Sequence, residues 1–391
     1  MNIKPPLGLV VMLMMFPQIM ETIYSPALPN IAENFAVSVA AASQTLSVYF
    51  MAFAIGVFCW GHLADIIGRR KAMLAGLVCY AIGSALALMV SDFSLLLMAR
   101  VLSAFGAAVG SVITQTMMRD SYSGEELAKV FSVMGMSLGI SPVIGLLLGS
   151  VLSAYWGYQG VFVALMVSAI VLLFLSLKSL PETKPAHTQK IAIGELAIKM
   201  LTDSGIIKNT LLVAAFNLMW FSYFSLAPFM FEAQGLSTLA FGTSGLLLGF
   251  GTFLGSYVNK IMLGRGHTGA RLVRLASAIA LVGGLGIWLI QSTFIGLNNV
   301  YFLAPMLLIV IAYGIAIPNI LSSALANYRT YAGSAGALFG LFYYILLGLG
   351  LGGTGIVHHL GMVITLSALL CVGLGLHFGL ANKVKKCLRR K

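Results

Sequence analysis

The chain is a succession of long apolar runs, and this pattern restricts its fold more than any other feature. A helix needs about 20 residues to cross the apolar part of a bilayer. Runs of about that length occupy residues 7–31, 43–61, 72–90, 94–117, 129–155, 160–177, 210–231, 239–262, 272–290, 300–325, 334–356 and 360–380. Only 9% of the residues are charged, which is too few to cover the surface of a soluble domain. The sequence therefore predicts an all-α integral membrane protein with twelve transmembrane helices.

A polar segment divides these runs into two sets of six. Residues 181–208 are too polar to cross a membrane, although residues 191–200 could form a short amphipathic helix on its surface. We therefore expect an N-terminal six-helix bundle at residues 1–180, a cytoplasmic linker at 181–208, and a C-terminal six-helix bundle with a basic tail at 209–391. Two such halves are typical of transporters that hold their substrate between them, near the middle of the membrane.

Apart from Arg100, lysine and arginine lie in or beside alternate loops, and this fixes the expected orientation. With the N-terminus in the cytoplasm, the cytoplasmic segments hold the basic residues and the external loops hold none. We expect both termini to lie in the cytoplasm and the protein to reside in a bacterial inner membrane. The net charge of +12 does not indicate nucleic-acid binding, because these charges occupy short loops and a tail that face anionic lipid.

The hairpin between the second and third spans has a specific spacing. It reads Gly61-x-x-x-Asp65-x-x-Gly68-Arg69-Arg70. A cytoplasmic loop needs basic residues but does not need this arrangement of acid and glycines. The spacing resembles the signature of the major facilitator superfamily, which implies that family's fold of two six-helix bundles. The resemblance also implies a latch, in which Asp65 and the arginines hold the two halves together on the cytoplasmic side in one state.

Glu21 and Arg100 are the charged residues that we place inside spans. A carboxylate in hydrocarbon costs several kcal/mol unless it is neutral, paired or facing a water-filled cavity. Glu21 is therefore a candidate for proton coupling or cation binding, the alternative being a structural carboxyl bonded to a neighbouring helix. Arg100 lies about six residues into the fourth span and needs a carboxylate, carbonyl groups or water. Glu21 is a candidate partner, directly or through substrate, and the alternative is that Arg100 reaches the outer surface.

Further residues in the spans are candidates for binding substrate or for gating. Each could instead serve only helix packing. The substrate-binding candidates are Gln18, Tyr24, Tyr49, Phe53, Gln115, Asn217, Trp220, Tyr223, Tyr313, Asn319 and Tyr343. The gating candidates outside the hairpin are Arg119, after the fourth span, and Gly139 and Pro142, where glycines four apart and a proline would make the fifth span a pivot.

Several stretches of the first half resemble one particular group within this superfamily. The run 24–32, the run 44–49, Met118-Arg119-Asp120 and the glycine-rich fifth span are similar to drug:proton antiporters of the bicyclomycin/chloramphenicol-resistance type. This resemblance implies proton-driven multidrug efflux by alternating access, with Arg100 taking part in proton coupling. The family has an aspartate where this chain has Thr22, and the carboxylate here is Glu21, about 100° away around the helix. A dedicated metabolite or siderophore exporter fits this pattern as well.

The remaining motifs limit the energy source and the partners. The chain lacks a Walker sequence, so we expect the proton gradient to drive transport and no cofactor to be required. Its histidines and cysteines lack the spacing of a metal site. A multi-span membrane enzyme, the remote alternative, would need clustered His, Asp or Glu at one membrane face. We therefore expect a secondary transporter and not an enzyme, working as a monomer with a small-molecule substrate in a lipid bilayer.

Overall fold

The computed structural model describes residues 4–185, 193–293 and 300–388, and within these ranges the chain forms helices and no strands. The first half contains α1 (Leu7–Ile23), the 3-10 turn η1 (Ser25–Ala27), α2 (Leu28–Asn34), α3 (Val39–Ile67), α4 (Arg69–Met89), α5 (Phe93–Ser121) and α6 (Gly124–Ser179). The linker contains α7 (Ile193–Thr202), which agrees with the amphipathic helix expected there. The second half contains α8 (Ser204–Ala233), α9 (Thr238–Gly264), α10 (Gly269–Thr293), α11 (Leu303–Ala324), the 3-10 turn η2 (Ala326–Tyr331), α12 (Ala332–Val357) and α13 (Leu360–Leu388).

These helices provide the twelve predicted crossings. Ten helical segments in the described ranges are long and apolar enough to cross a membrane, α1 and α2 together forming one of them. The 56-residue α6 crosses twice, because Gly157 adopts a φ of +62° that breaks the helix. Asn30 fixes this reversal by accepting a hydrogen bond from the backbone N–H of Tyr158 at 2.8 Å. The apolar part of α13, Leu360–Leu376, completes the set.

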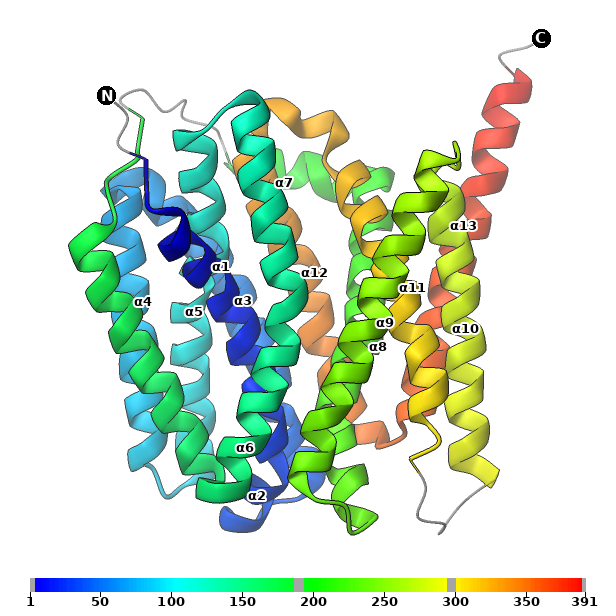
Figure 1. The fold of residues 1–391 in the computed structure, drawn as a ribbon. Coiled ribbons are helices and arrows are strands. Elements are labelled where there is room, and N and C mark those ends of the chain that lie inside the picture. Colours follow the sequence, from blue (N-terminus) through cyan, green and yellow to red (C-terminus); the bar gives the residue numbers. More distant parts are fainter. Residues whose placement is uncertain (1–3, 186–192, 294–299, 389–391) are drawn as a thin grey trace.

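The helices form two bundles that lie side by side, with both chain ends on the same side of the molecule (Figure 1). In the first bundle α1 packs on α5 and α6, and α4 packs on α5. In the second, α10 packs on α11 and α13. The bundles meet where α3 contacts α12 and where α6 contacts α9. The all-α, two-bundle architecture predicted from the sequence is confirmed, whereas the domain limits given above stay a prediction.

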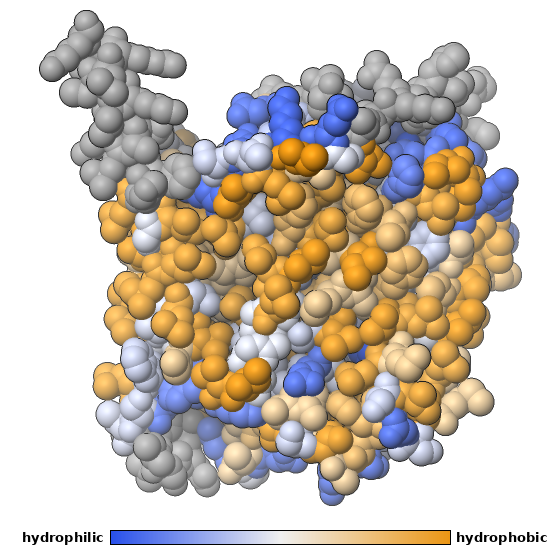
Figure 2. Space-filling model, turned by 180° about the vertical axis from the view of Figure 1, so that it is seen from behind, coloured by the Kyte–Doolittle hydropathy of each residue, from blue (hydrophilic) through white to orange (hydrophobic). Residues whose placement is uncertain are grey.

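The outer surface fits a bilayer. Figure 2 shows a broad belt of apolar side chains with hydrophilic residues along both edges. Large apolar residues such as Ile55, Met98, Phe174 and Leu289 are more than half exposed. Such exposure is unfavourable in water and favourable in lipid. We call the end of the molecule that carries the chain termini and the α3–α4, α5–α6 and α9–α10 connections the basic end.

Candidate functional site

A cavity of about 360 Å³ lies between the two bundles. Its walls come from α1, α3, α5 and α6 of the first half and from α8, α9, α11 and α12 of the second. Most of the residues predicted from the sequence to bind substrate line it. Those residues are Gln18, Phe53, Gln115, Asn217, Trp220, Tyr313 and Tyr343, together with Glu21, Gly139 and Pro142.

The wall contributed by the second half is aromatic. Trp220 of α8 stacks on Tyr313 of α11, with ring centres 5.3 Å apart and planes 21° apart. The Tyr313 hydroxyl donates a hydrogen bond to the Asn217 side chain at 3.2 Å, which fixes the orientation of that ring. Tyr343 and Tyr344 of α12 continue the wall, with ring centres 4.2 Å apart. This wall presents flat π surfaces with few polar atoms, which suits a planar or apolar molecule.

Glu21 is the single acid among the residues that line the cavity. Its side chain is only 1% exposed, and its Oε1 atom has no hydrogen-bond partner among the described residues. The cavity lining includes no lysine, arginine or histidine. A carboxyl in this position can bind a proton or contact a cation without first breaking a protein ion pair.

The neighbouring residue, Thr22, explains why the acid stands at position 21. The Thr22 hydroxyl donates to the carbonyl oxygens of Gln18 and Ile19, at 3.0 and 3.3 Å. It lies against Gly145 of α6, where even a single added methyl group would collide with it. Position 22 therefore faces the dry α1–α6 contact, and position 21 faces the cavity.

Arg100 is buried and does not form an ion pair with Glu21. The nearest aromatic faces hold its guanidinium, whose carbon lies 4.0 Å from the ring centre of Tyr24 and 4.5 Å from that of Tyr49. No nitrogen of the guanidinium has a hydrogen-bond partner among the described residues. Arg100 is still within electrostatic range of Glu21. Its exposure of 0% excludes the alternative in which it reaches the outer surface.

Four predicted substrate-binding residues do not line the cavity. Tyr24 and Tyr49 sandwich Arg100 instead. Tyr223 shares a hydrogen bond of 2.5 Å with the Ser244 hydroxyl, inside the second bundle. Asn319 donates to the Asn259 side chain at 2.6 Å and so connects α11 to α9. The sequence could not separate these positions from the cavity wall, because all of them are polar or aromatic residues within apolar spans.

The cavity extends toward the basic end. A second hollow of about 270 Å³ shares Gln115 and Tyr343 with the first and is lined farther along by Arg119 and Gly336. Arg119 is thus at the mouth of this route. Gly139 has free space where a side chain would stand, so the glycine face expected to pack tightly is open to the cavity at this point.

Hydrogen bonds between the two bundles close the opposite end. The Ser25 hydroxyl donates to the carbonyl of Phe224 at 2.5 Å, and the Ser47 hydroxyl donates to the carbonyl of Gly348 at 2.6 Å. The rings of Phe50 and Phe221 meet across the same boundary, 4.5 Å apart. These serines could not be identified from the sequence, because small hydroxyl residues are common in membrane helices and carry no distinctive signal.

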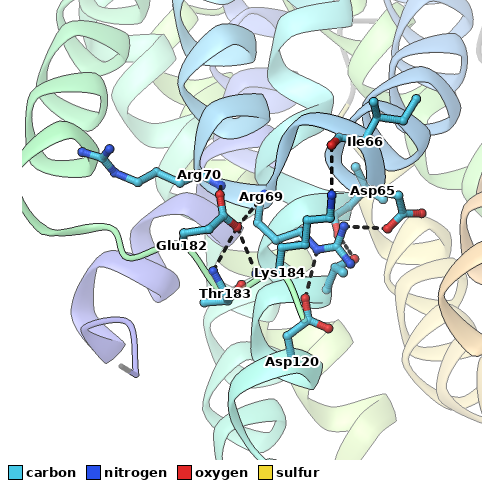
Figure 3. Close-up of polar contacts among 10 residues, drawn as sticks. Asp65, Ile66, Arg69, Arg70, Asp120, Glu182, Thr183 and Lys184 are labelled. Carbon is cyan, nitrogen blue, oxygen red and sulfur yellow. Dashed lines mark hydrogen bonds and ion pairs between the residues drawn. The ribbon is translucent and has the colours of Figure 1, made fainter. Parts of the chain in front are cut away.

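The hairpin motif forms an ionic cluster at the basic end (Figure 3). The Arg69 guanidinium binds Asp65 at 2.5 Å and Asp120 at 2.9 Å, and its side chain is only 4% exposed. These residues belong to α4, α3 and α5, all in the first bundle. Among the described residues, the ion pairs of Arg69 do not join the two bundles, so the predicted latch between the halves is not formed here, in keeping with the hollow that leads to this end.

The segment after α6 completes the cluster. Glu182 accepts hydrogen bonds from the backbone N–H groups of Arg69 and Arg70, at 2.8 and 3.2 Å, and so caps the N-terminus of α4 (Figure 3). Lys184 donates to the carbonyl of Ile66 at 2.9 Å and caps the C-terminus of α3. Gly68 has a φ of +101°, and a side chain there would strike Glu182. The analysis of the sequence did not single out Glu182, because its partners are backbone groups.

Gly61 lies where the bundles meet on the cavity side of this cluster. A methyl group added there would lie 3.7 Å from Ala337 of α12 and 3.4 Å from Val112 of α5. This residue therefore permits close approach of α3 to helices of both bundles.

The sequence is similar to known proteins over most of its length. A family model described as Major Facilitator Superfamily matches residues 10–352. An uncharacterized transporter of Rickettsia bellii is 31% identical over 354 residues, covering 88% of each chain. Multidrug resistance protein D of Escherichia coli is 25% identical, covering 85% of this chain and 84% of that protein. A chloramphenicol resistance protein of Pseudomonas aeruginosa is 28% identical, covering 83% of this chain and 77% of that protein.

Solved structures share the fold at low sequence identity. A D-xylose-proton symporter superposes with a TM-score of 0.75 at 14% identity, covering 93% of this chain and 96% of that one. The POT family transporter PepTSo superposes with a TM-score of 0.75 at 12% identity, covering 97% and 98%. These similarities concern the fold alone.

Proposed function

Because this chain belongs to the major facilitator superfamily and is a membrane transporter of small molecules, we propose that it exports small lipophilic compounds in exchange for protons by alternating access. The basic end would face the cytoplasm, and the cavity would load from that side. The protein would work as a monomer in the inner membrane of a bacterium, with both termini in the cytoplasm and the proton gradient as its energy source.

The position of Glu21 carries this proposal. Its carboxyl lines the cavity between the bundles, is almost fully buried, and has an oxygen without a partner. An ionised carboxylate there favours a bound cation or dipole, and a protonated one favours release. Substrate and proton would thus compete, because each stabilises a different ionisation state of one group.

The chemistry of the cavity indicates the substrate class. It offers one acid, no basic side chain and an aromatic wall, so it favours neutral or cationic aromatic molecules over anions. Its volume of about 360 Å³ falls within the usual range for sites of drug-sized ligands. The names of the multidrug and chloramphenicol resistance relatives point to the same class.

A dedicated metabolite exporter is the second candidate. It is favoured by the Rickettsia bellii relative, which at 31% identity is described only as a transporter. Profiling of metabolites and drugs in cells with and without the gene separates the candidates. Retention of many unrelated lipophilic drugs in the deleted strain supports multidrug efflux. Retention of one metabolite alone supports the dedicated exporter.

Proton exchange is tested in everted membrane vesicles that hold an acidic interior. Adding a transported drug should release protons in the wild type and should not do so in Glu21→Gln. Glu33→Gln is the matched control, because Glu33 is an exposed acid on the same membrane crossing and does not line the cavity. If Glu21→Gln releases protons as the wild type does, the carboxyl is not the coupling group.

A further inference from the structure

The net charge of this protein resides almost entirely in its second half. Residues 204–391 contain twelve lysines and arginines and a single acid, Glu232, which gives them a net charge of +11. Residues 1–203 contain eleven lysines and arginines and ten acids, which gives them a net charge of +1. The two parts hold almost the same number of basic residues, so the difference in net charge comes from the acids, which contribute little to the orientation of the chain in the membrane.

Three cations at the basic end of the first half are paired with carboxylates of the same half. Lys4 binds Glu126 at 2.6 Å, and Arg69 binds two aspartates. Lys129 binds Glu125 at 3.1 Å. Protein groups thus supply most of the counter-charge that these cations require.

The second half has no such acids at its basic end. Lys260 and Arg265 at the end of α9, and Arg271 and Arg274 at the start of α10, are all exposed. None of the four lies within 4 Å of a carboxylate among the described residues. Glu232 cannot serve them, because it lies at the far end of α8.

Helix α13 lies beside this place. It packs on α10, and the stem of Arg274 lies against it, 3.1 Å from the position of a methyl group added to Gly375. Beyond its apolar part, which ends at Leu376, the helix continues to Leu388, about 18 Å farther at 1.5 Å per residue. The sequence of that extension includes three lysines, at positions 383, 385 and 386.

We propose that the basic ends of α9 and α10 form a binding site for anionic phospholipid headgroups, which supply the counter-charge that the second half lacks. The site lies where the exposed apolar sides of α9 and α10 meet their cations, so acyl chains and headgroups of one lipid contact it together. Each lysine or arginine near an anionic surface strengthens binding roughly fivefold. The site is independent of Glu21 and of the cavity.

The test uses the purified full-length protein, freed of lipid in a neutral detergent and titrated with phosphatidylglycerol, with phosphatidylcholine as the neutral lipid. Native mass spectrometry counts the bound lipids, and the thermal midpoint reports stabilisation. The variant Lys260→Gln/Arg271→Gln/Arg274→Gln should bind phosphatidylglycerol on the order of 100-fold more weakly. The control Lys4→Gln/Lys129→Gln removes two exposed cations of the first half that are paired with Glu126 and Glu125, and should bind it like the wild type.

Two further measurements keep the test decisive if the triple variant does not fold. Arg271→Lys/Arg274→Lys retains the charge and should retain binding, and added salt should weaken binding to the wild type. Equal losses in the second-half variant and the first-half control would overturn the proposal, as would binding that is indifferent to salt. Polyglutamate serves as a probe for an acidic protein partner. If the second-half triple variant binds phosphatidylglycerol like the wild type but no longer binds polyglutamate, the surface is a site for an acidic protein and the proposal is overturned.

Discussion

Exchanging the residues at positions 21 and 22 tests whether the direction of the acid matters. In Glu21→Thr/Thr22→Asp the carboxyl moves about 100° around α1, from the cavity to the contact with α6. At that place the Thr22 hydroxyl donates to two carbonyl oxygens and touches Gly145. An aspartate there would be crowded, and its carboxylate would face carbonyl oxygens that repel it. Crowding costs about 1–3 kcal/mol, and an unsatisfied buried polar group costs a similar amount. We expect a loss of about 3 kcal/mol of stability and no coupled transport.

The assay combines the thermal midpoint in detergent with drug-induced proton release in everted vesicles. Glu21→Asp is the control, because it keeps a carboxyl pointing in the original direction. It should retain proton release and most of the stability. If the exchanged variant couples drug and proton movement as well as Glu21→Asp does, the assignment of positions 21 and 22 to different faces of α1 is refuted.

Three other predictions concern the rest of the site. Arg69→Gln should lower the free energy of unfolding by about 2 kcal/mol, because it leaves Asp120 without its buried partner. Lys4→Gln should lower it by less than about 1 kcal/mol, because its ion pair is half-exposed. Equal thermal midpoints of the two variants would contradict this. Trp220→Ala should raise the KM for an aromatic drug about 2- to 10-fold through the lost ring contacts while leaving the proton release per drug unchanged, and an uncoupled variant would contradict this. Ser47→Val removes a hydrogen bond across the closed end that contributes about 1 kcal/mol. The ratio of molecules open at that end to molecules closed there should rise about fivefold. Spin-label distances between the bundles that are the same as in the wild type would contradict this.

The helical framework could be predicted from the sequence, because hydrocarbon requires long apolar helices with satisfied backbones. The expected gap between residues 155 and 160 corresponds to the break at Gly157. The spacing from Gly61 to Arg70 likewise indicated an acid and arginines close together at one end, and the structure places Asp65 and Arg69 in contact.

The internal faces could not be predicted, because a span that is apolar all round gives no sign of which side meets the cavity. Tyr24 and Tyr49 were expected on its wall and instead enclose Arg100, since aromatic faces can hold a cation where no carboxylate reaches it. The expected latch joined the two halves, but in this structure the Arg69 side chain binds Asp120 of the first half, and its backbone N–H donates to Glu182 at the start of the linker. Those partners are distant in sequence, so the spacing of the hairpin could not reveal them.

The aromatic wall and the buried acid come from different halves of the chain. Trp220, Tyr313 and Tyr343 belong to α8, α11 and α12, while Glu21 and Arg100 belong to α1 and α5. A chimaera that joins this first half to the second half of a relative should therefore keep the proposed proton coupling and change its substrate specificity. Selection for new substrates can thus act on the second half of the gene, while the first half keeps the residues proposed to couple transport to protons.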